Sequence, residues 1–512
     1  MPLTPLQALL SQAQSRPEAT AFIFHDDVWT YRRLAEESQR VAHGLAANGV
    51  KPGDRVALHI LNRPEILVTY YACFRLGAIA APLRTSFTFA ELAPLLQRLQ
   101  PALYIGEAAV YPNVAPLDTM TLPVSHRILV DEHAGTHGVR PWDVLKQAPS
   151  VDLPTPSIHE PALLIHTSGT TSGTPKFVAH TPSSLAATND IVCKHIGLST
   201  DDIWVSAMTM VQASGALRAQ CFIQLGAPFV VLDSFDADAL LDNIERYRGT
   251  CLFGFPAQYA ALIQSQQAKP RDLSSLRFAT VGGDICPIEL QQKATSVLGT
   301  PLYNMWTATE TTGCLTFGLQ PGSVMRVMEG AQIRLVDGQG SDVPHGEIGE
   351  LLVRGPNVFS FYWGDPAATA QVLKDGWYHT GDLMRRGEGN DIWFVARKKD
   401  IIIRGGANIS PIEVEEALVA SHPAVKEAAV IGKPDPVLGQ RVFAFVKLTA
   451  KAKKPAVSEI LDKVGQRLAA YKVPEDLIVL DDLPRNPSSK VDRVRLKALL
   501  SERSDVTNRT AD

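Results

Sequence analysis

The apolar positions over the first hundred residues switch between helical and strand spacing. Residues 31–48 carry their apolar side chains on one stripe, at intervals of three and four, and Asn48-Gly49 ends the pattern. Residues 56–60 then alternate as a strand does. The alternation continues with a helix over 64–76, an apolar run over 78–83, and a further helix and strand within 90–105. This order predicts an α/β domain with a largely parallel sheet.

The character of the chain changes near residues 385–410. Ser410 to Glu413 has the pattern of a helix start, with Ser as the N-cap, Pro at the first helical position and Glu placed to complete a capping box. The tail then predicts a helix over 411–420, strands over 425–431 and 441–448, a helix over 457–469 and a strand over 477–480. Residues 401–512 carry 18 Lys and Arg against 15 Asp and Glu, whereas the rest of the chain is acidic. We therefore predict a large N-terminal domain, 1–399, and a small C-terminal domain, 400–512.

Composition excludes several classes of protein. The chain has 512 residues, of which 45% are hydrophobic and 20% charged, which is ordinary for a globular protein and excludes disordered and coiled-coil chains. The length predicts about three structural units. The formal net charge of −4 lacks the positive excess that accompanies binding to a phosphate backbone, so nucleic acid is not an expected partner.

The cysteines and the apolar segments point to the cytoplasm. Six cysteines stand singly, with no C-x-x-C pair, which favours reduced thiols over a disulfide framework or a zinc site. The N-terminal segment has no basic region before its short apolar stretch, unlike a signal peptide. The most apolar window, Tyr70 to Leu83, is interrupted by Arg75 and is too short to span a bilayer. A cytoplasmic protein without a transmembrane segment is expected.

A hydroxyl-rich segment follows the apolar run at 162–165, which is a plausible buried strand. Six of its ten residues carry hydroxyls, two are glycines, and a lysine closes it: Thr167, Ser168, Gly169, Thr170, Thr171, Ser172, Gly173, Thr174, Pro175 and Lys176. Backbone N–H groups exposed by glycine, hydroxyl groups and a lysine together suit a phosphate. The alternative is a surface linker rich in Ser, Thr and Gly. The segment is not a Walker loop, because Thr174 and Pro175 separate Gly173 from Lys176.

This segment resembles the phosphate loop of the adenylate-forming family, which includes acyl-CoA synthetases, luciferases and the adenylation domains of peptide synthetases. The family pattern is roughly T-S-G-[ST]-T-G-x-P-K-G-V. Ser172 and Phe177 stand where glycines are usual, and Pro182 falls near a customary histidine.

Four further segments resemble family motifs in the family order. They are Asn304 to Glu310 for Y-G-x-T-E, Trp377 to Asp382 for W-x-x-T-G-D, Arg397 to Pro411 for R-x-K-D…G-G-x-N-I-x-P, and Leu483 to Arg493 for L-P-R-T-x-S-G-K-I-x-R. Within them Trp306 replaces tyrosine, and Thr307 and Ser489 replace glycines. Residues 346–362 match a G-E-x-G-E…G-P…G-Y stretch, which is interpreted mainly as structural.

The resemblance implies a role for each matching residue. The 167–176 loop would surround the β- and γ-phosphates of ATP, and Thr309 would contact the α-phosphate. Glu310 would help to hold Mg²⁺, Asp382 would accept bonds from the ribose hydroxyls, and Arg397 would touch ribose or phosphate. Lys490 would serve adenylation. Taken alone, the Thr309-Glu310 pair would be interpreted as a helix start and Lys490 as a surface charge.

The remaining implied roles concern domain motion and the binding of nucleotide and acid. Lys399 would lie at the hinge between the domains, and Gly405 and Gly406 would admit the pantetheine arm of CoA. Gly283 and Trp306 would border the nucleotide. The acid pocket would be lined by Gln212, Gly282, Gly283, Trp306 and Thr307.

The pocket residues favour a small or medium carboxylic acid, aliphatic, branched or aryl, because Trp306 would narrow the pocket. Gln212 could bond a polar substituent of the acid or only form the wall; both interpretations stay open. The expected reaction is attack of the acid on ATP to give an acyl-adenylate and pyrophosphate, followed by transfer to CoA with release of AMP, with Mg²⁺ required.

The family also implies a fold: a large N-terminal domain of stacked α/β subdomains with a small β-barrel-like part, and a small mobile C-terminal α+β domain. One alternative function is a free-standing adenylation enzyme that loads the phosphopantetheine of a carrier protein. Another is a non-catalytic nucleotide-binding relative, although Lys490, Glu310, Asp382 and Arg397 are all retained. The oligomeric state is left open between a monomer and a homodimer.

Overall fold

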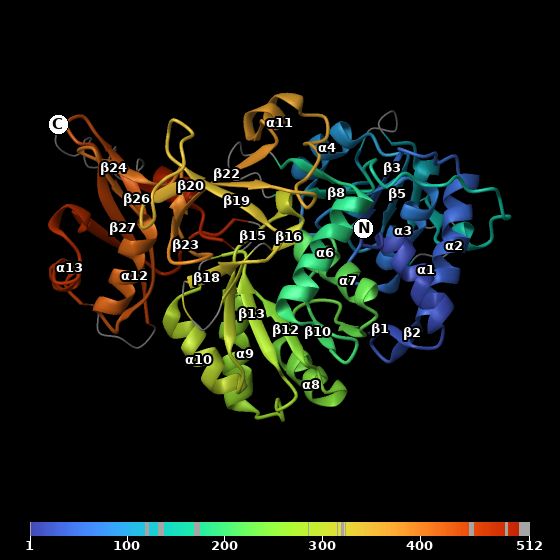
Figure 1. Ribbon diagram of the computed structural model, residues 1–512, viewed down its shortest axis with the longest axis horizontal. Coiled ribbons are helices and arrows are strands. Elements are labelled where there is room, and N and C mark those ends of the chain that lie inside the picture. The colour runs from blue at the N-terminus through green and yellow to red at the C-terminus, as the bar shows by residue number, and fades with distance from the viewer. Residues whose placement is uncertain are drawn as a thin grey trace. The chain divides into compact units, whose positions relative to one another are not determined.

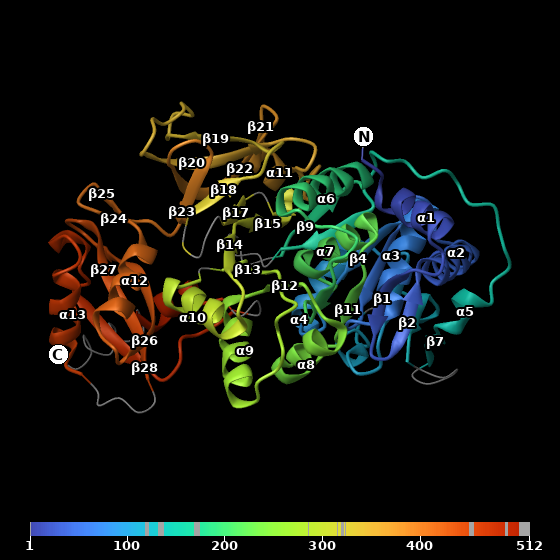
Figure 2. The same ribbon diagram turned by 60° about the horizontal axis from the view of Figure 1, so that its bottom comes forward.

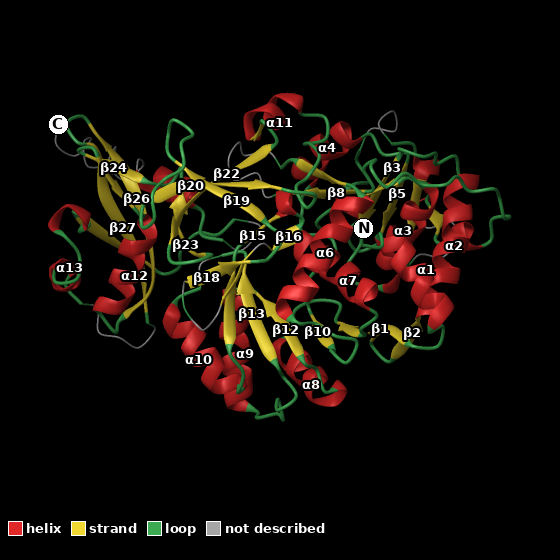
Figure 3. Ribbon diagram, in the orientation of Figure 1, coloured by secondary structure: helices red, strands yellow, loops and turns green. Residues whose placement is uncertain are grey.

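The computed structural model describes residues 2–117, 122–131, 138–167, 175–284, 286–314, 316–318, 322, 324–449, 455–486 and 490–500. The chain divides into two compact units. The first comprises Met1–Ile333 and Val353–Tyr378, and the second comprises Arg334–Leu352 and His379–Asp512. Figure 1 labels their helices and strands, and Figure 3 separates the two kinds of element by colour.

One sheet of the first unit has the strand order β7-β6-β5-β3-β4-β8-β9. Its neighbours are parallel except for the antiparallel pair β8 and β9. The strands are β3 (Arg55–His59), β4 (Ile79–Pro82), β5 (Leu103–Gly106), β6 (Arg127–Leu129), β7 (Arg140–Pro141), β8 (Leu163–His166) and β9 (Phe177–His180). The helices that precede or connect them are α2 (Tyr31–Ala47), α3 (Pro64–Leu76), α4 (Phe89–Leu99) and α5 (Asp143–Lys146). The helices predicted over 31–48 and 64–76 and the largely parallel sheet are confirmed.

The other large sheet of this unit has the order β14-β13-β12-β10-β11-β1-β2. Only its edge pair, β1 and β2, is antiparallel. The strands are β1 (Thr20–Phe24), β2 (Asp27–Thr30), β10 (Trp204–Ser206), β11 (Phe229–Val231), β12 (Cys251–Gly254), β13 (Phe278–Gly282) and β14 (Leu302–Met305). The accompanying helices are α1 (Pro5–Ser15), α6 (Pro182–Ile196), α7 (Ala213–Leu225), α8 (Ala237–Tyr247), α9 (Pro256–Ala268) and α10 (Ile288–Leu298).

Both large sheets are covered on both faces, as parallel sheets usually are. On β3, Val56 and Leu58 join the central core with α2 and α3, whereas Ala57 between them joins a separate cluster with α4. On β10, Trp204 joins the central core, and Val205 joins a cluster with α8 and α9. Figure 2 shows α8 and α9 on the face of the second sheet opposite α7.

Short elements complete the first unit. They are β15 (Thr307–Ala308), a 3₁₀ turn (Thr309–Thr311), β16 (Gly313–Cys314), β17 (Thr316–Gly318), β18 (Val324–Val327), α11 (Pro366–Val372) and β21 (Leu373–Lys374), with further 3₁₀ turns at Tyr111–Asn113 and Val124–His126. Among the described helices, none combines the length and the apolar character that crossing a membrane requires.

The second unit is built on antiparallel strands. One group has the order β23-β22-β20-β19, and another has the order β25-β24-β27-β26 with β28 beside β27. The strands are β19 (Gln332–Val336), β20 (Ile348–Arg354), β22 (Trp377–Arg386), β23 (Asp391–Arg397), β24 (Ile402–Arg404), β25 (Ala407–Ile409), β26 (Val425–Asp435), β27 (Gly439–Leu448) and β28 (Asp476–Leu480). The helices are α12 (Pro411–Ser421) and α13 (Val457–Gly465), with a 3₁₀ turn at Ala470–Lys472.

The predicted elements of the tail are confirmed, with two changes in length. β26 extends to Asp435 because its last residues pair with the start of β27, Pro434 with Gln440 and Asp435 with Gly439. α13 ends at Gly465, before the predicted 469, consistent with the low helix propensity of glycine.

The predicted capping box of α12 is only half formed. Ser410 caps the helix, since its side chain accepts the N–H of Glu413. The carboxylate of Glu413 instead binds Lys472 Nζ at 2.6 and 2.8 Å. The opposite charge of Lys472 makes it a stronger partner than a backbone N–H. The mixed α/β class, with a large N-terminal and a smaller C-terminal part, is confirmed, whereas the boundary at 399/400 and the mobility of the small domain stay predictions.

Candidate active site

The hydroxyl-rich loop connects β8 to β9. The backbone N–H of Thr167 donates to the carbonyl of Lys176 at 2.8 Å, so the two ends of the loop are held together. The predicted strand before the loop is confirmed, and the loop leaves its carboxyl end, where α/β proteins bind ligands. The loop residues between these ends lie outside the described residues: Ser168, Gly169, Thr170, Thr171, Ser172, Gly173 and Thr174.

Lys176 and Glu310 meet at one side chain, Tyr362. The Lys176 ammonium lies 4.9 Å from the centroid of the Tyr362 ring, and the Tyr362 hydroxyl donates to Glu310 Oε1 at 2.8 Å. The backbone fixes this arrangement, because Trp363 N donates to Phe177 O and Phe359 N donates to Glu310 O, both at 2.8 Å. The structure therefore brings the loop lysine and the predicted Mg²⁺ ligand to the same place.

The electrostatics of this group favour a protonated tyrosine. Burial raises the pKa of Tyr362 above its ordinary value, and the negative charge of Glu310 raises it further. Tyr362 is thus the donor, and it orients one oxygen of the Glu310 carboxylate. Among the described residues no other side chain is recorded bonding to the second oxygen, Oε2.

A single carboxylate suits Mg²⁺ here. Mg²⁺ usually takes one or two carboxylates together with water and substrate phosphates. In the described part of the chain, no group of three His, Cys, Asp or Glu side chains forms a cage for a metal. Glu310, oriented by Tyr362 near the closing lysine of the loop, fits the kind of site that Mg²⁺–ATP needs.

The two glycines and the tryptophan of the predicted acid pocket lie at or next to the ends of two neighbouring strands. Gly282 ends β13 beside Met305 at the end of β14, and Trp306 and Thr307 follow directly. A Cβ on Gly282 would lie 3.0 Å from Met305 O. Gly283 has φ +79°, and a Cβ there would lie 2.9 Å from the ring of Phe255. The close packing explains why both positions are glycine.

Trp306 and Thr309 are placed by the same short stretch of chain. Trp306 is buried, and its backbone N–H donates to Thr316 Oγ1 at 2.9 Å. Thr309 begins the 3₁₀ turn that carries Glu310, so the Thr309-Glu310 pair does start a helical turn.

Gln212 lies at the same edge of the sheet. It precedes α7, in the segment that follows β10, and its side chain makes no cap bond to the helix. β10 neighbours β12, and β12 neighbours β13, so this segment follows a strand two places from the one that ends at Gly282. Four of the five predicted pocket residues therefore lie at the carboxyl ends of β13 and β14 or within two residues of them, and Gln212 lies in the segment that connects β10 to α7.

In the second unit, Asp382 and Arg397 are cross-strand partners on β22 and β23. Arg397 Nε lies 2.7 Å from Asp382 Oδ1, and the Asp382 side chain is almost fully buried. The structure thus joins Asp382, predicted to bind the ribose, to Arg397, predicted to touch ribose or phosphate, and the arginine holds the carboxylate in place.

Glu350 supports this pair, and the sequence analysis did not assign it a functional role. Its buried carboxylate accepts from Lys398 Nζ at 2.8 Å and from Gly381 N at 3.3 Å, on either side of the Asp382 and Arg397 pair. The signal available in the sequence was the second glutamate of the G-E-x-G-E stretch. Tyr362, at the end of the same stretch, was likewise interpreted as structural.

The predicted hinge and thiol-access residues lie in turns. Lys399 follows β23. Desolvation lowers its pKa below the ordinary value, and the like charge of Arg397 adds to this effect. Gly405 and Gly406, with φ +57° and +85°, form the turn between β24 and β25, and a Cβ on Gly406 would meet no described atom within 4 Å.

Lys490 lies at the end of a short loop that its own backbone closes. Asn486 N donates to Lys490 O at 2.8 Å, and Lys490 N donates to Asn486 Oδ1 at 3.2 Å. The following segment is anchored by Leu496 and Leu500 in a core with Phe443 and Phe445. Lys490 and Glu310 belong to different units, so their convergence on one nucleotide stays a prediction.

Comparison with known proteins agrees with this arrangement. The family model of the AMP-binding enzyme matches residues 9–363, and that of the AMP-binding enzyme C-terminal domain matches residues 413–490. Indoleacetate–CoA ligase of Aromatoleum aromaticum is 34% identical over 502 residues, which cover 95% of this chain and 96% of that protein. Medium-chain fatty-acid–CoA ligase of Escherichia coli is 31% identical over 505 residues, covering 95% of this chain and 88% of that protein.

Solved structures give the same result. An anthranilate CoA ligase in complex with anthranoyl-AMP has a TM-score of 0.88 and 25% identity, covering 97% of both chains. The o-succinylbenzoate CoA synthetase of Bacillus subtilis, in complex with ATP and magnesium ion, has a TM-score of 0.83 and 29% identity, covering 96% of this chain and 99% of that chain.

The chain belongs to the AMP-binding enzymes, the adenylate-forming family that includes the acyl-CoA synthetases. Within that family it is an AMP-forming carboxylic acid–CoA ligase, which activates its acid as an acyl-adenylate and then transfers the acyl group to CoA. Its cosubstrates and cofactor are ATP, CoA and Mg²⁺.

Proposed function

We propose that this ligase acts on a small to medium carboxylic acid, aliphatic, branched or aryl. The observation that carries this proposal is the close packing around Gly282, Gly283 and Trp306 at the carboxyl ends of β13 and β14. Such packing favours a small or medium acid over a long chain. The acids named for two similar enzymes, indoleacetate and a medium-chain fatty acid, lie in this size range.

In the first half-reaction, the carboxylate of the acid attacks the α-phosphorus of ATP. Both reactants are negative, so the protein must supply positive charge and hydrogen-bond donors. Lys176 and the loop before it would hold the β- and γ-phosphates, and Lys490 would bind between the carboxylate and the α-phosphate. Mg²⁺, when bound at Glu310, would neutralise charge on the phosphates.

The nucleoside would be held by the second unit. Asp382 would accept from the two ribose hydroxyls, and Arg397, which pairs with it, would contact ribose or phosphate. The short aspartate–arginine distance supports this role, because a buried carboxylate held by one cation keeps its acceptor geometry.

In the second half-reaction, the CoA thiol attacks the acyl carbonyl and AMP leaves. Gly405 and Gly406 would border the path of the pantetheine arm, and the open space beside Gly406 supports this proposal. Rotation about Lys399 would exchange the Lys490 loop for the glycine turn between the two half-reactions.

The test is a panel of carboxylic acids of increasing length, assayed with ATP, Mg²⁺ and CoA. Pyrophosphate release and acyl-CoA formation are measured, with a phosphopantetheinylated carrier protein as the alternative acceptor. We expect conversion of short, branched or aryl acids and weak conversion of long chains. Preference for the long chains would contradict the proposed substrate class, and loading of the carrier in place of CoA would identify a free-standing adenylation enzyme.

We further propose a cytoplasmic location, supported by the scattered free cysteines. A homodimer stays a prediction. Light scattering coupled to size-exclusion chromatography would distinguish it from a monomer.

A further inference from the structure

The side chain of Asn62 joins the carboxyl ends of the two large sheets. It lies between β3 and α3, and it is buried. Its Nδ2 group donates to Met208 O and to Leu232 O, each at 2.9 Å, and its Oδ1 accepts from Met210 N at 2.7 Å. Met208 and Met210 follow β10 and Leu232 follows β11, so one amide connects the first sheet to two strand ends of the second.

Tyr70 holds the same segment from α3. Its hydroxyl donates to Met210 O at 2.6 Å, and the side chain is fully buried. Between them, Asn62 and Tyr70 satisfy both backbone groups of Met210 and the carbonyl of Met208. These groups are buried, and each would be left without a partner if the side chain that bonds it were removed.

The segment held in this way leads directly to Gln212. Gln212 N donates to Thr209 O at 3.2 Å, and a Cβ on Gly215 would lie 2.3 Å from Thr209 O. The segment from Met208 to Gln212 is therefore packed against the start of α7 on one side. On the other side it is fixed by Asn62 and Tyr70. A shift of Met210 would be passed to Gln212 through this short, tightly packed turn.

We propose that Asn62 and Tyr70 are positioning residues for the acid: they fix the backbone of Met208 to Met210 and thereby the position of Gln212 at the acid site. The inference rests on the proposed function, because it takes Gln212 as part of the acid pocket. Neither residue touches the substrate. They affect the affinity for the acid and the selectivity between acids, and they do not affect the binding of ATP.

Tyr70 and its neighbour Tyr71 offer a matched pair of substitutions. Both are fully buried on α3, and no described residue is a hydrogen-bond partner of the Tyr71 hydroxyl. Tyr70→Phe and Tyr71→Phe remove the same atom from adjacent residues. Only the first removes a hydrogen bond to the segment before Gln212. A third variant, Asn62→Asp, keeps the size of the side chain but replaces its two N–H donors with an acceptor.

The experiment measures kcat and the KM values for acid and for ATP in the unmodified enzyme and the three variants, using two acids of different length. Tyr70→Phe is expected to raise the KM for the acid by about three- to tenfold and to change the ratio of kcat/KM between the two acids, with the KM for ATP within about twofold. Asn62→Asp should have the larger effect, and Tyr71→Phe should leave both KM values unchanged.

Hydrogen exchange of the amides over 207–212 provides a readout that needs no substrate. Exchange there should quicken in Tyr70→Phe and not in Tyr71→Phe. Equal effects of the two Phe variants on the acid KM, or a uniform loss of kcat without any change in acid selectivity or exchange, would overturn the inference. Failure of the unmodified enzyme to convert any acid of the panel would instead contradict the proposed substrate class, and the exchange comparison would still decide the positioning role.

Discussion

At the scale of single residues, two side chains that the sequence analysis left without a functional role hold residues of the predicted site in place. Tyr362 joins Lys176 to Glu310, and Glu350 holds both flanks of the Asp382 and Arg397 pair. Such residues orient the groups that we propose contact the nucleotide, and precise orientation is a large part of catalysis by charge stabilisation. Two predictions belong to this scale.

Tyr362→Phe should raise the concentration of Mg²⁺ that the enzyme requires. The phenyl ring still packs beside Lys176, but the hydrogen bond to Glu310 Oε1 is lost, and a bond to a charged group contributes about 1.5–3 kcal/mol. We expect the Mg²⁺ concentration for half-maximal pyrophosphate exchange to rise by roughly tenfold. Tyr247→Phe is the control, since the only described bond of that hydroxyl is a long one, 3.5 Å, to His25 O. An unchanged Mg²⁺ requirement in Tyr362→Phe would remove Tyr362 from the metal site.

Lys490→Ala should separate the two half-reactions. Loss of the charge between carboxylate and α-phosphate is expected to lower acyl-adenylate formation by about a hundredfold or more. Thioester formation from supplied acyl-adenylate should stay near the unmodified rate. Lys463→Ala, which removes an exposed lysine paired with Glu459, is the control. Equal loss of both half-reactions in Lys490→Ala would contradict the proposed role.

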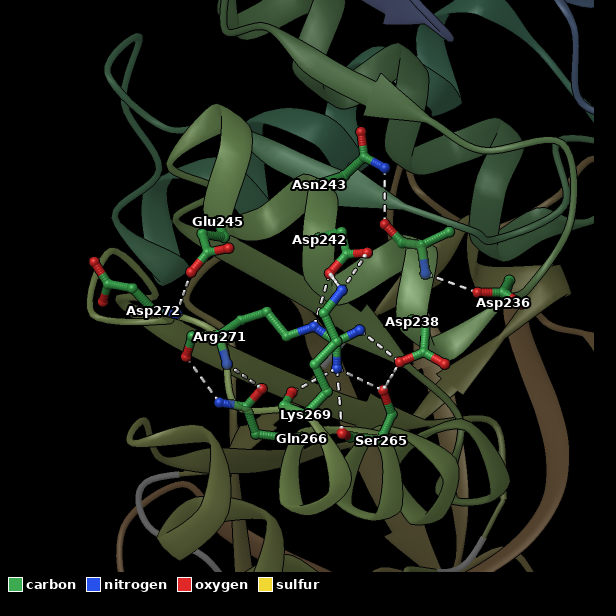
Figure 4. Close-up of polar contacts among 11 residues, drawn as sticks. Asp236, Asp238, Asp242, Asn243, Glu245, Ser265, Gln266, Lys269, Arg271 and Asp272 are labelled. Carbon is green, nitrogen blue, oxygen red and sulfur yellow. Dashed lines mark hydrogen bonds and ion pairs between the residues drawn. The ribbon is translucent and has the colours of Figure 1, made fainter.

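At the scale of elements, one buried arginine links α8 to α9, which pack against one face of the second large sheet. The Nε group of Arg271 donates to Asp242 Oδ1 at 2.7 Å, and the guanidinium also pairs with Asp238 (Figure 4). Its Nη1 group donates to the carbonyl of Lys269 at 2.7 Å and to Ser265 Oγ at 2.9 Å. Its side chain is 1% exposed, whereas Asp238 and Asp242 reach solvent. The hydrogen bond to Arg271 is also the main cause of the lowered pKa of Asp242.

Arg271→Met should destabilise the first unit. The substitution leaves the carbonyl of Lys269 without the Arg271 donor and removes the pairs with Asp238 and Asp242. We expect the free energy of unfolding to fall by about 2–3 kcal/mol. Urea unfolding followed by tryptophan fluorescence measures this change. Arg248→Met removes an exposed pair with Asp272 from the same region, and should leave the unfolding midpoint nearly unchanged. Similar midpoints for the two variants would show that the Arg271 network contributes little.

At the scale of the whole molecule, buried histidines make stability depend on pH. Burial lowers the pKa of His59 to about 4 and those of His166 and His180 to about 3, against an ordinary value of 6.5. Below pH 6.5 the unfolded chain therefore binds more protons than the folded one. The stability that these neutral histidines allow is fully present above pH 6.5, and the free energy of unfolding decreases as the pH falls toward 4 and then 3.

We expect the free energy of unfolding to fall by about 1.4 kcal/mol per pH unit for each such histidine below pH 6. Urea midpoints at pH 7, 6 and 5 measure the slope. His180→Gln should reduce this slope by about 1.4 kcal/mol per pH unit, which is the contribution of one buried histidine. His159 is exposed, so His159→Gln should leave the slope unchanged. A slope that is the same in His180→Gln as in the unmodified enzyme would show that His180 is not held neutral by burial.

Much of the order of helices and strands could be predicted because it depends on short stretches of sequence. The stripe over 31–48 became α2, and the helix over 64–76 became α3, whose last residue is followed by Gly77 in a left-handed conformation with φ +73°. The hydroxyl-rich loop and the motifs after it could be assigned to a family for the same reason, since each motif is a run of neighbours. Helix caps, strand alternation and loop chemistry all depend on residues within a few positions of one another.

Contacts between residues that are far apart in the sequence could not be predicted from such short stretches. Asn62 bonds Met208, Tyr362 bonds Glu310, and Glu413 bonds Lys472 instead of closing its capping box. Which partner a side chain meets depends on strand order, register and the packing of helices over a sheet, and no local window contains that information. The residue types and their order therefore settled the chemistry available to this enzyme, and three-dimensional packing settled which groups orient one another to perform it.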